Sequence, residues 1–419
     1  MDKNKAEDSP EGFPKGSKII RIACEKDLYE KAMDDSQEFK SMLADHIKVY
    51  PELFPAEIHK GYSLYGKGRC SKKLDNLQFQ RIKIKTTGEI FSVYPAFVMP
   101  YLIAYTADID KALILRKHDV PYSTLVYIFG KDEMYWYRAE QAFSHCSIVG
   151  TSVKKKELLP KHIAADEKHS KRLKDKVYVA TTVAGECMLG AEVCADASEK
   201  SLTAGYSVFA DEAKNIAPDY APESVNTDGW EATQIAFSSL FLSITIIRCF
   251  LHGFIKIRDC CRTSPMFGAI CSQIWHVYKA SSKQAFSQRM RRFKEWAMTN
   301  LEPSSTALAK ILSLHSRSSQ YQVAYDHPEG YRTSNMCDRL MRLLDRSIFT
   351  RQKFHGKLSS ANDAVRSWAI LRNYYPYCLR KTKSKHTFSC AASELNGFKY
   401  SDNWLVNLVA ASSMNGYRQ

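Results

Sequence analysis

Three aspartates stand at positions from which a folded chain could bring carboxylates together. Asp166 and Asp228 each follow a short strand-like run, and Asp338 lies in a helical pattern at 333–347. Carboxylate oxygens are the ligands that Mg²⁺ prefers, and two such ions about 3.5–4 Å apart activate an attacking oxygen and stabilise a leaving oxygen in phosphodiester cleavage. We therefore expect these three acids to be catalytic and to hold two Mg²⁺ (or Mn²⁺) ions.

Each of these acids also has an ordinary structural interpretation. An aspartate at the end of a strand often caps a turn or the next helix, and Asp338 could pair with Arg342 on a helix surface. Glu329 is an alternative third acid, because it also precedes the last helix of the pattern, although its Pro-Glu-Gly context is typical of a loop. The order of the surrounding elements favours the catalytic interpretation of Asp166 and Asp228.

The elements around the first two acids follow a regular order. Strands are predicted at 162–167, 177–183, 187–195, 224–227 and 244–247, and helices at 202–213, through 239 and from about 250. The resulting βββ-α-β-α-β-α order, with acids ending the first and fourth strands, is the plan of the ribonuclease H-like fold. We therefore predict the α/β class, with a mixed sheet flanked by helices and formed by residues 156–260 and 331–419.

Residues 261–330 interrupt this plan and are predicted to form a helical insertion. The insertion is basic, as in FSQRMRRFKEW at 286–296, so we expect it to hold phosphate groups and to release them as salt rises. The helix that follows carries Asn335, Asp338 and Arg342 at i, i+3 and i+7, on a stripe beside its apolar residues.

The remaining N-terminal part divides into a polar tail, predicted to be disordered, at 1–18 and a mainly helical region at 19–155. The pattern of this region is mostly helical to about residue 58, and the segment 77–93 then alternates apolar and polar residues around Thr-Thr-Gly, which predicts a hairpin.

Three short helical patterns at 109–117, 122–129 and 131–143 come next, and Gly130 separates the second from the third. A helix, a glycine turn and a helix form the plan of a helix-turn-helix, whose last helix enters the major groove of DNA. We therefore expect the 19–155 region to bind DNA and name the third helix's Lys131, Tyr135 and Arg138 as the contacting side chains. Packing within a helical bundle is the alternative interpretation.

The overall composition agrees with a polyanionic partner. Lys and Arg exceed Asp and Glu, which gives a net charge of +15 and an isoelectric point near 9.1, and nucleic acid is the first expectation for such a surplus. The polar N-terminus has no signal-peptide core, and charged residues interrupt the apolar stretch at 235–257. We expect a cytoplasmic, nucleoid-associated protein without membrane contact. The 12 cysteines form no Cys-x-x-Cys pair, so reduced thiols are expected rather than a zinc ribbon.

Four segments together resemble a known family of proteins. They are ADEKH at 165–169, VNTDGWEAT at 225–233, CFLH at 249–252 and RTSNMCDR at 332–339. The set resembles the DDE transposases of bacterial and archaeal insertion sequences, nearest their Mutator-like branch. In that branch a helical insertion separates the second and third acids, a Cys-x-x-His follows the strand after the second acid, and the last acid lies in a Thr-Thr-Asn-x-x-Glu-Arg helix. The resemblance covers roughly residues 160–380.

This resemblance implies a function and further site residues. It implies recognition of terminal inverted repeats, release of a 3′-hydroxyl at the element end and attack of that hydroxyl on target DNA, by a homodimer or higher multimer on paired ends. It also implies DNA-contacting roles for His252, Asn335 and Arg339. The glutamate of the family is Asp338 in this chain, so the shorter side chain must come closer to the metal or the activity is impaired.

Two other functions stay open on the residues alone. One is a non-catalytic DNA-binding protein derived from a transposase, which the Asp338 substitution permits, and the other is a nuclease of the same fold without strand transfer. Cys249 and His252 could also bind zinc with a distant pair. The sequence offers no second pair, so a packing or DNA-positioning role is expected for them.

Overall fold

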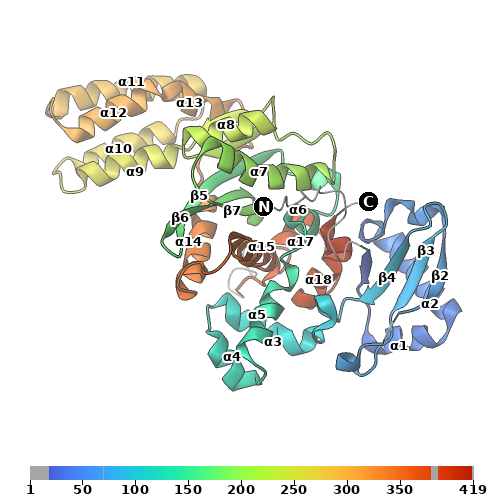
Figure 1. Ribbon diagram of the computed structural model, residues 1–419. Coiled ribbons are helices and arrows are strands. Elements are labelled where there is room, and N and C mark those ends of the chain that lie inside the picture. The colour runs from blue at the N-terminus through green and yellow to red at the C-terminus, as the bar shows by residue number, and fades with distance from the viewer. Residues whose placement is uncertain (1–17, 69, 379–385, 418–419) are drawn as a thin grey trace, which may run out of the picture.

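The computed structural model describes residues 18–68, 70–378 and 386–417. The tail predicted at 1–18 lies outside the described residues, apart from Lys18. The α/β class is confirmed, because helices surround two mixed sheets of four and five strands. Figure 1 shows these sheets well apart, with a layer of helices from the C-terminal part of the chain between them.

The four-stranded sheet lies in the N-terminal part. Its strands are β1 (Ile19–Ile22), β2 (Tyr62–Lys67), β3 (Gln80–Ile84) and β4 (Ile90–Pro95), in the order β1-β4-β3-β2. The predicted hairpin is confirmed as β3 and β4, which pair antiparallel. The prediction of a mostly helical segment up to residue 58 was wrong at its start, because β1 pairs in parallel with the distant β4. The helices α1 (Lys26–Asp34) and α2 (Ser36–Val49) follow β1.

Short helices come after this sheet. They are α3 (Thr106–Lys117), α4 (Tyr122–Phe129), α5 (Glu133–Glu140) and α6 (Ile148–Ser152). Gly130 ends α4 with φ +71°, a conformation that glycine adopts without strain. Asp132 then caps α5 by accepting a hydrogen bond from the Tyr135 amide at 2.7 Å. The predicted helix, glycine turn and helix are therefore present.

The five-stranded sheet forms the centre of the molecule. Its strands are β5 (His162–Arg172), β6 (Asp175–Ala184), β7 (Cys187–Cys194), β8 (Ser224–Thr227) and β9 (Thr245–Arg248). Their order is β7-β6-β5-β8-β9. Within this sheet, β6 pairs antiparallel with both β5 and β7, whereas β8 is parallel to both β5 and β9. Parallel pairing brings the carboxyl ends of β5 and β8 toward the same edge of the sheet.

Helices cover both faces of this sheet, as Figure 1 shows. On one face, α7 (Glu199–Lys214) and α8 (Glu231–Leu240) share an apolar cluster with Ala165 of β5. On the other face, α14 (Asn335–Thr350) and α15 (Leu358–Tyr374) share a cluster with Ala164. Because side chains alternate along a strand, Asp166 belongs to the α14 face and Glu167 to the α7 face.

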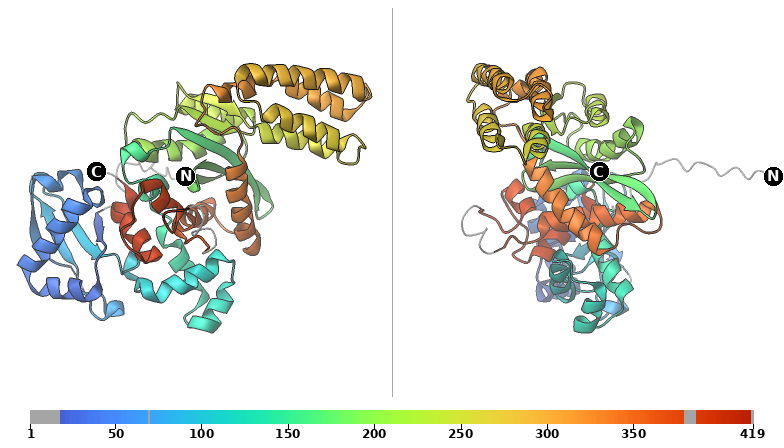
Figure 2. Two further views of the ribbon diagram at one scale, coloured as in Figure 1. Left: turned by 180° about the vertical axis from the view of Figure 1, so that it is seen from behind. Right: turned by 90° about the vertical axis from the view of Figure 1, so that its left-hand side faces the viewer.

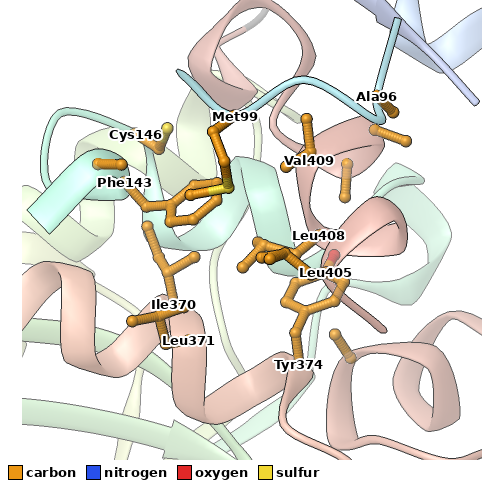
Figure 3. Close-up of a cluster of buried hydrophobic side chains, with 14 of the residues drawn as sticks. Ala96, Met99, Phe143, Cys146, Ile370, Leu371, Tyr374, Leu405, Leu408 and Val409 are labelled. Carbon is orange, nitrogen blue, oxygen red and sulfur yellow. The ribbon is translucent and has the colours of Figure 1, made fainter. Parts of the chain in front are cut away.

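The C-terminal helices join the two sheets. They are α15, α17 (Ala391–Asn396) and α18 (Trp404–Ala411). In Figure 3, Ile370 and Tyr374 of α15 meet Leu408 of α18 together with Met99 and Phe143 from the N-terminal region. These buried side chains form one core, so the N-terminal region is packed onto the central sheet through this helical layer.

Five helices form an arm that projects from the central sheet in Figures 1 and 2. They are α9 (Phe250–Cys261), α10 (Phe267–Tyr278), α11 (Lys283–Asn300), α12 (Thr306–Ser316) and α13 (Ser318–Gln322). The arm has an apolar cluster of its own, to which α9 contributes, so the packed unit begins at Phe250 rather than at the predicted 261. No helix among the described residues combines the length and the apolar character that crossing a membrane requires.

Candidate functional site

Asp166 lies within β5 and not at its end. Residues 162–164 of β5 pair with β8, but β5 continues to Arg172 because its antiparallel partner β6 keeps it extended. The prediction that Asp166 ends the first strand was therefore wrong. Asp166 instead stands just past the end of the parallel pairing, where its carboxylate faces the edge at which β8 ends.

Asp228 is the residue that directly follows β8. Its Oδ1 accepts a hydrogen bond from the Trp230 amide at 2.7 Å, and Gly229 between them has φ +94°. A Cβ at Gly229 would lie 2.5 Å from the guanidinium carbon of Arg248. Glycine is therefore needed in this turn both for its backbone conformation and for the close approach of Arg248.

Asp338 comes from the first turn of α14 and completes the group. Oxygen and nitrogen donors of Asp166, His252 and Asp338 all lie within 4.8 Å of one another, and His252 Nε2 is 4.0 Å from Asp338 Oδ1. Asp228 is not part of this group of donors, but burial and then the neighbouring charge of Asp228 raise the pKa of Asp166. The structure thus brings the three predicted acids to one edge of the sheet.

Glu329, the alternative third acid, lies elsewhere. It is exposed on the loop before α14, and its charge acts on His162, the first residue of β5. His162 and Asp166 are four residues apart along an extended strand, which corresponds to about 13 Å. Asp338, and not Glu329, is therefore the acid that joins Asp166.

Burial, together with the neighbouring charges, raises the pKa values of two acids of this group. Burial, followed by the neighbouring charge of Asp228, raises the pKa of Asp166 to about 6. Burial also raises the pKa of Asp338, although the nearby charges of His252 and Arg342 oppose the shift. Carboxylates held in this way are stabilised in their ionised form by a bound divalent cation.

Cys249 and His252 form a polar connection from α9 to the start of α14. Cys249 Sγ accepts hydrogen bonds from Ser334 N at 3.1 Å and from Ser334 Oγ at 3.2 Å. The side-chain hydrogen bond with Cys249 raises the pKa of His252 to about 9, and Asp338 and Asp166 act in the same direction against the effect of burial. Burial would raise the pKa of Cys249, but the hydrogen bonds from His252 and Ser334 outweigh it and lower the pKa.

The sequence identified the Cys-x-x-His pattern but not its position next to the acids. His252 was expected to pack or to position DNA, and the structure places its imidazole beside Asp166 and Asp338, whose charges help to raise its pKa. The pattern itself was the available signal. Its relation to the acids depends on how α9 and α14 meet at the sheet edge.

Glu167 is a buried acid that was not identified from the sequence. It is 7% exposed, and its Oε1 accepts hydrogen bonds from the hydroxyls of Tyr206, at 2.5 Å, and Thr233. Burial raises its pKa to about 7, although both hydrogen bonds favour the ionised form. Its place directly after Asp166 in a strand, facing the helices α7 and α8, was the signal that could have found it.

A basic cavity of about 200 Å³ opens beside Asp228, between the sheet edge and the helical arm. Its cationic lining residues are Arg248, Lys256, Lys310 and Arg317. Arg248 comes from the end of β9, and the other three come from the arm. The acidic group therefore continues into a surface that attracts anions.

The other predicted DNA-contacting residues lie in two places. Lys131 and Arg138 are exposed and Tyr135 is half-buried on the α4–α5 unit. Helix α15 lies between that unit and the central sheet in Figure 1, so these three are not part of the acidic site. Asn335 and Arg339 are exposed on α14 near Asp338.

Arg339 also has a partner within the chain, since its Nη2 donates to Glu186 Oε1 at 2.7 Å. Glu186 belongs to the turn between β6 and β7, so this pair ties α14 to the sheet. No protein-family model and no curated protein sequence matches the chain.

Proposed function

We propose that this protein is a DDE-type transposase that cleaves DNA at the ends of a mobile element and joins the freed ends to target DNA. The observation that carries the proposal is the grouping of Asp166 and Asp338 with His252 at the edge of the central sheet, where the charge of Asp228 also acts on Asp166. Three carboxylates drawn from two neighbouring strands and a crossing helix are the arrangement that two-metal phosphodiester chemistry needs.

The topology of the sheet supports the proposal. A β7-β6-β5-β8-β9 order, antiparallel through its first three strands and parallel after them, is the arrangement expected of a ribonuclease H-like domain. The helical arm also separates Asp228 from Asp338 in the chain, as the resemblance to Mutator-like transposases implies.

The residues at the sheet edge fit a divalent cation. The Asp166 carboxylate is partly buried near other acids, with its pKa raised to about 6 by burial and the charge of Asp228, and hard carboxylate oxygens are the ligands that Mg²⁺ or Mn²⁺ takes. When bound, two such ions activate the attacking oxygen and stabilise the leaving oxygen. Asp166, Asp228 and Asp338 would hold them.

The shorter side chain of Asp338 is compatible with this role because α14 packs closely on the sheet. The buried Cys337, next to Asp338, lies with its Sγ 3.7 Å from Thr181 Oγ1 of β6, and Thr181 is paired with Asp166 across the strands. The helix therefore packs directly on the strands that carry Asp166, which keeps Asp338 close to it despite the shorter side chain.

Other residues of the chain would hold and orient DNA. Arg248 and Lys256 line the cavity beside Asp228, where they would bind the phosphate next to the scissile bond. A protonated His252 beside Asp338 would position a phosphate or the leaving oxygen. Lys131, Tyr135 and Arg138 would contact DNA away from the reaction, as expected for recognition of the element ends.

The proposal is tested with duplexes taken from the DNA on either side of the reading frame. The protein is incubated with Mg²⁺, and cleaved and joined products are separated on denaturing gels. We expect both products from wild type and from Asp211→Asn, an exposed acid of α7. Asp228→Asn should lose at least about a hundredfold in rate while retaining DNA binding.

Each other outcome of this experiment rejects the proposal in a different way. Cleavage without joined product would indicate a nuclease, and DNA binding without cleavage would indicate a DNA-binding protein that has lost the chemistry. Full activity of Asp228→Asn would refute the two-metal site altogether.

A further inference from the structure

A second group of ligand-type side chains lies where β5 and β8 begin, on the far side of their parallel pairing from the acids. His162 begins β5, Glu223 directly precedes β8, and His327 belongs to the loop that returns from the helical arm. Their donor atoms all lie within 4.8 Å of one another. None of these three residues takes part in the function proposed above.

The backbone holds two of these residues in fixed positions. His162 and Ser224 are partners in the parallel pairing of β5 with β8. The Glu223 amide donates to the Lys161 carbonyl at 2.7 Å, and the Thr245 amide donates to the Glu223 carbonyl at 3.0 Å. The strand pairing of the sheet therefore places His162 and Glu223 next to each other, without a contribution from any loop.

The third residue is brought in by a tight turn. The Gly330 amide donates to the His327 carbonyl at 2.9 Å. A Cβ on Gly330 would lie 3.1 Å from that carbonyl oxygen and 3.2 Å from Ser224 Oγ, which is closer than side-chain carbons normally approach. The missing side chain thus lets the turn lie directly on the start of β8. The Asn226 side chain fixes the following residue by donating to the Tyr331 carbonyl at 2.9 Å.

The His162 ring is oriented for a ligand. Its Nδ1 is 2.9 Å from Oγ of the buried Ser224, so its Nε2 points to Glu223, whose Oε2 is 4.0 Å away. The rings of His162 and His327 are 5.7 Å apart between centroids. Histidines that bind metals are commonly held through their second nitrogen in this way.

We propose that His162, Glu223 and His327 bind one late first-row divalent cation, with Zn²⁺ as the reference ion and water as the fourth ligand. Two imidazoles and a carboxylate are a ligand set that Zn²⁺ takes, whereas Mg²⁺ prefers oxygen donors alone. Tetrahedral Zn²⁺ with bonds of about 2.0–2.1 Å holds its donors about 3.3 Å apart. Closing the 4.0 Å between His162 Nε2 and Glu223 Oε2 to that distance needs a side-chain movement below about 1 Å.

The charges around the three ligands are compatible with a bound cation. Lys161 is the nearest positive charge, with its Nζ 3.3 Å from Glu223 Oε1, but its side chain is 73% exposed and can turn to solvent. Glu329 adds a second negative charge, which acts on His162. The bound ion would tie the return from the helical arm to the sheet. Because it binds the folded chain only, it would raise the melting temperature.

The test uses the full-length protein freed of metal and titrated with Zn²⁺ alone in a competition assay with a chromogenic chelator. The assay is repeated for His327→Ala and Glu223→Gln, and for the control His276→Ala, which removes an exposed histidine of α10. A double variant, Asp166→Asn with Asp338→Asn, separates this site from the acidic one.

Wild type, the His276→Ala control and the acidic double variant should bind one equivalent of Zn²⁺ that excess Mg²⁺ does not displace. Both ligand variants should lose it, with a fall in affinity beyond the roughly 10–100-fold that loss of an outer partner costs. Ser224→Ala, which removes that outer partner of His162, should fall within the 10–100-fold range.

Two results would overturn the proposal. One is a His327→Ala protein that binds Zn²⁺ as tightly as His276→Ala does. The other is loss of the Zn²⁺ equivalent in the acidic double variant, which would locate it at Asp166 and Asp338 instead. Neither result bears on DNA cleavage, so this proposal and the proposed function fail separately.

Discussion

Removing the charge of Asp166 by Asp166→Asn is expected to stabilise the metal-free protein at neutral pH. Asp166 is partly buried next to Asp338, and the charge of Asp228 acts on it. Its ionised carboxylate therefore has a higher free energy in the folded chain than in the unfolded chain, where water surrounds it. An amide of the same shape keeps the packing and removes the repulsion.

The size of the effect follows from the pKa shift. Burial and the Asp228 charge raise the pKa of Asp166 from 3.8 to about 6, and a difference of 2.2 units corresponds to about 3 kcal/mol. Because the folded state holds this proton more tightly, the stabilisation is complete below the unfolded pKa and is lost as the pH rises through the folded pKa. About 1.4 kcal/mol of the loss falls between pH 5 and pH 7.5.

The measurement is denaturant-induced unfolding at both pH values in the presence of a chelator. Wild type and the exposed-acid control Asp211→Asn should lose about 1.4 kcal/mol more than Asp166→Asn between pH 5 and pH 7.5. Addition of Mg²⁺ at pH 7.5 should stabilise wild type clearly and Asp166→Asn much less, because the variant lacks one of the proposed ligands.

Two results would refute this reasoning. If Asp166→Asn were no more stable than Asp211→Asn at pH 7.5, the carboxylates would not repel one another as their positions require. If Mg²⁺ stabilised Asp166→Asn as much as wild type, Asp166 would not be a ligand of the ion.

Three further predictions concern the same sheet edge. Asp338→Asn should lose at least about a hundredfold in the DNA cleavage rate. Asp338→Glu keeps an ionised carboxylate and should stay within about tenfold of the wild-type rate. Equal rates for the two variants would show that Asp338 is not part of the site. Cys249→Ala should lower the pKa of His252 from about 9, since the hydrogen bond with Cys249 is the main cause of its elevation; titration of the ring protons by NMR measures the shift, and an unchanged pKa would contradict the assignment. Gly229→Ala should cost about 1–3 kcal/mol in unfolding free energy, because φ is +94° there and a Cβ would meet Arg248; a melting temperature equal to that of wild type would contradict the geometry.

Local signals were sufficient for several elements. The predicted helix at 122–129 is α4, because Pro121 starts it and Gly130 ends it, and both residues act within the segment. The predicted strand at 224–227 is β8, which is buried and ends at the turn that Gly229 permits. Such elements depend on residues a few positions apart, so they can be predicted directly from the sequence.

Elements that depend on strand pairing were missed or misplaced. The strand β1 is short and lies in a segment predicted to be helical, but it pairs with β4 about seventy residues later. Asp166 was expected at a strand end, but β5 continues to Arg172 because it forms a hairpin with β6. In both cases the hydrogen bonds of a paired strand decided the conformation.

The sequence by itself determined which side chains are available for chemistry and which elements carry them, including the acids Asp166, Asp228 and Asp338 and the Cys-x-x-His of α9. Only the tertiary structure decided that His252 joins these acids, that Glu329 does not, and that His327 meets His162. The physical reason is that donor atoms must come within a few ångströms of one another to share a cation. Across separations of 62 residues and more, that proximity is set by strand pairing and helix packing and not by any local pattern.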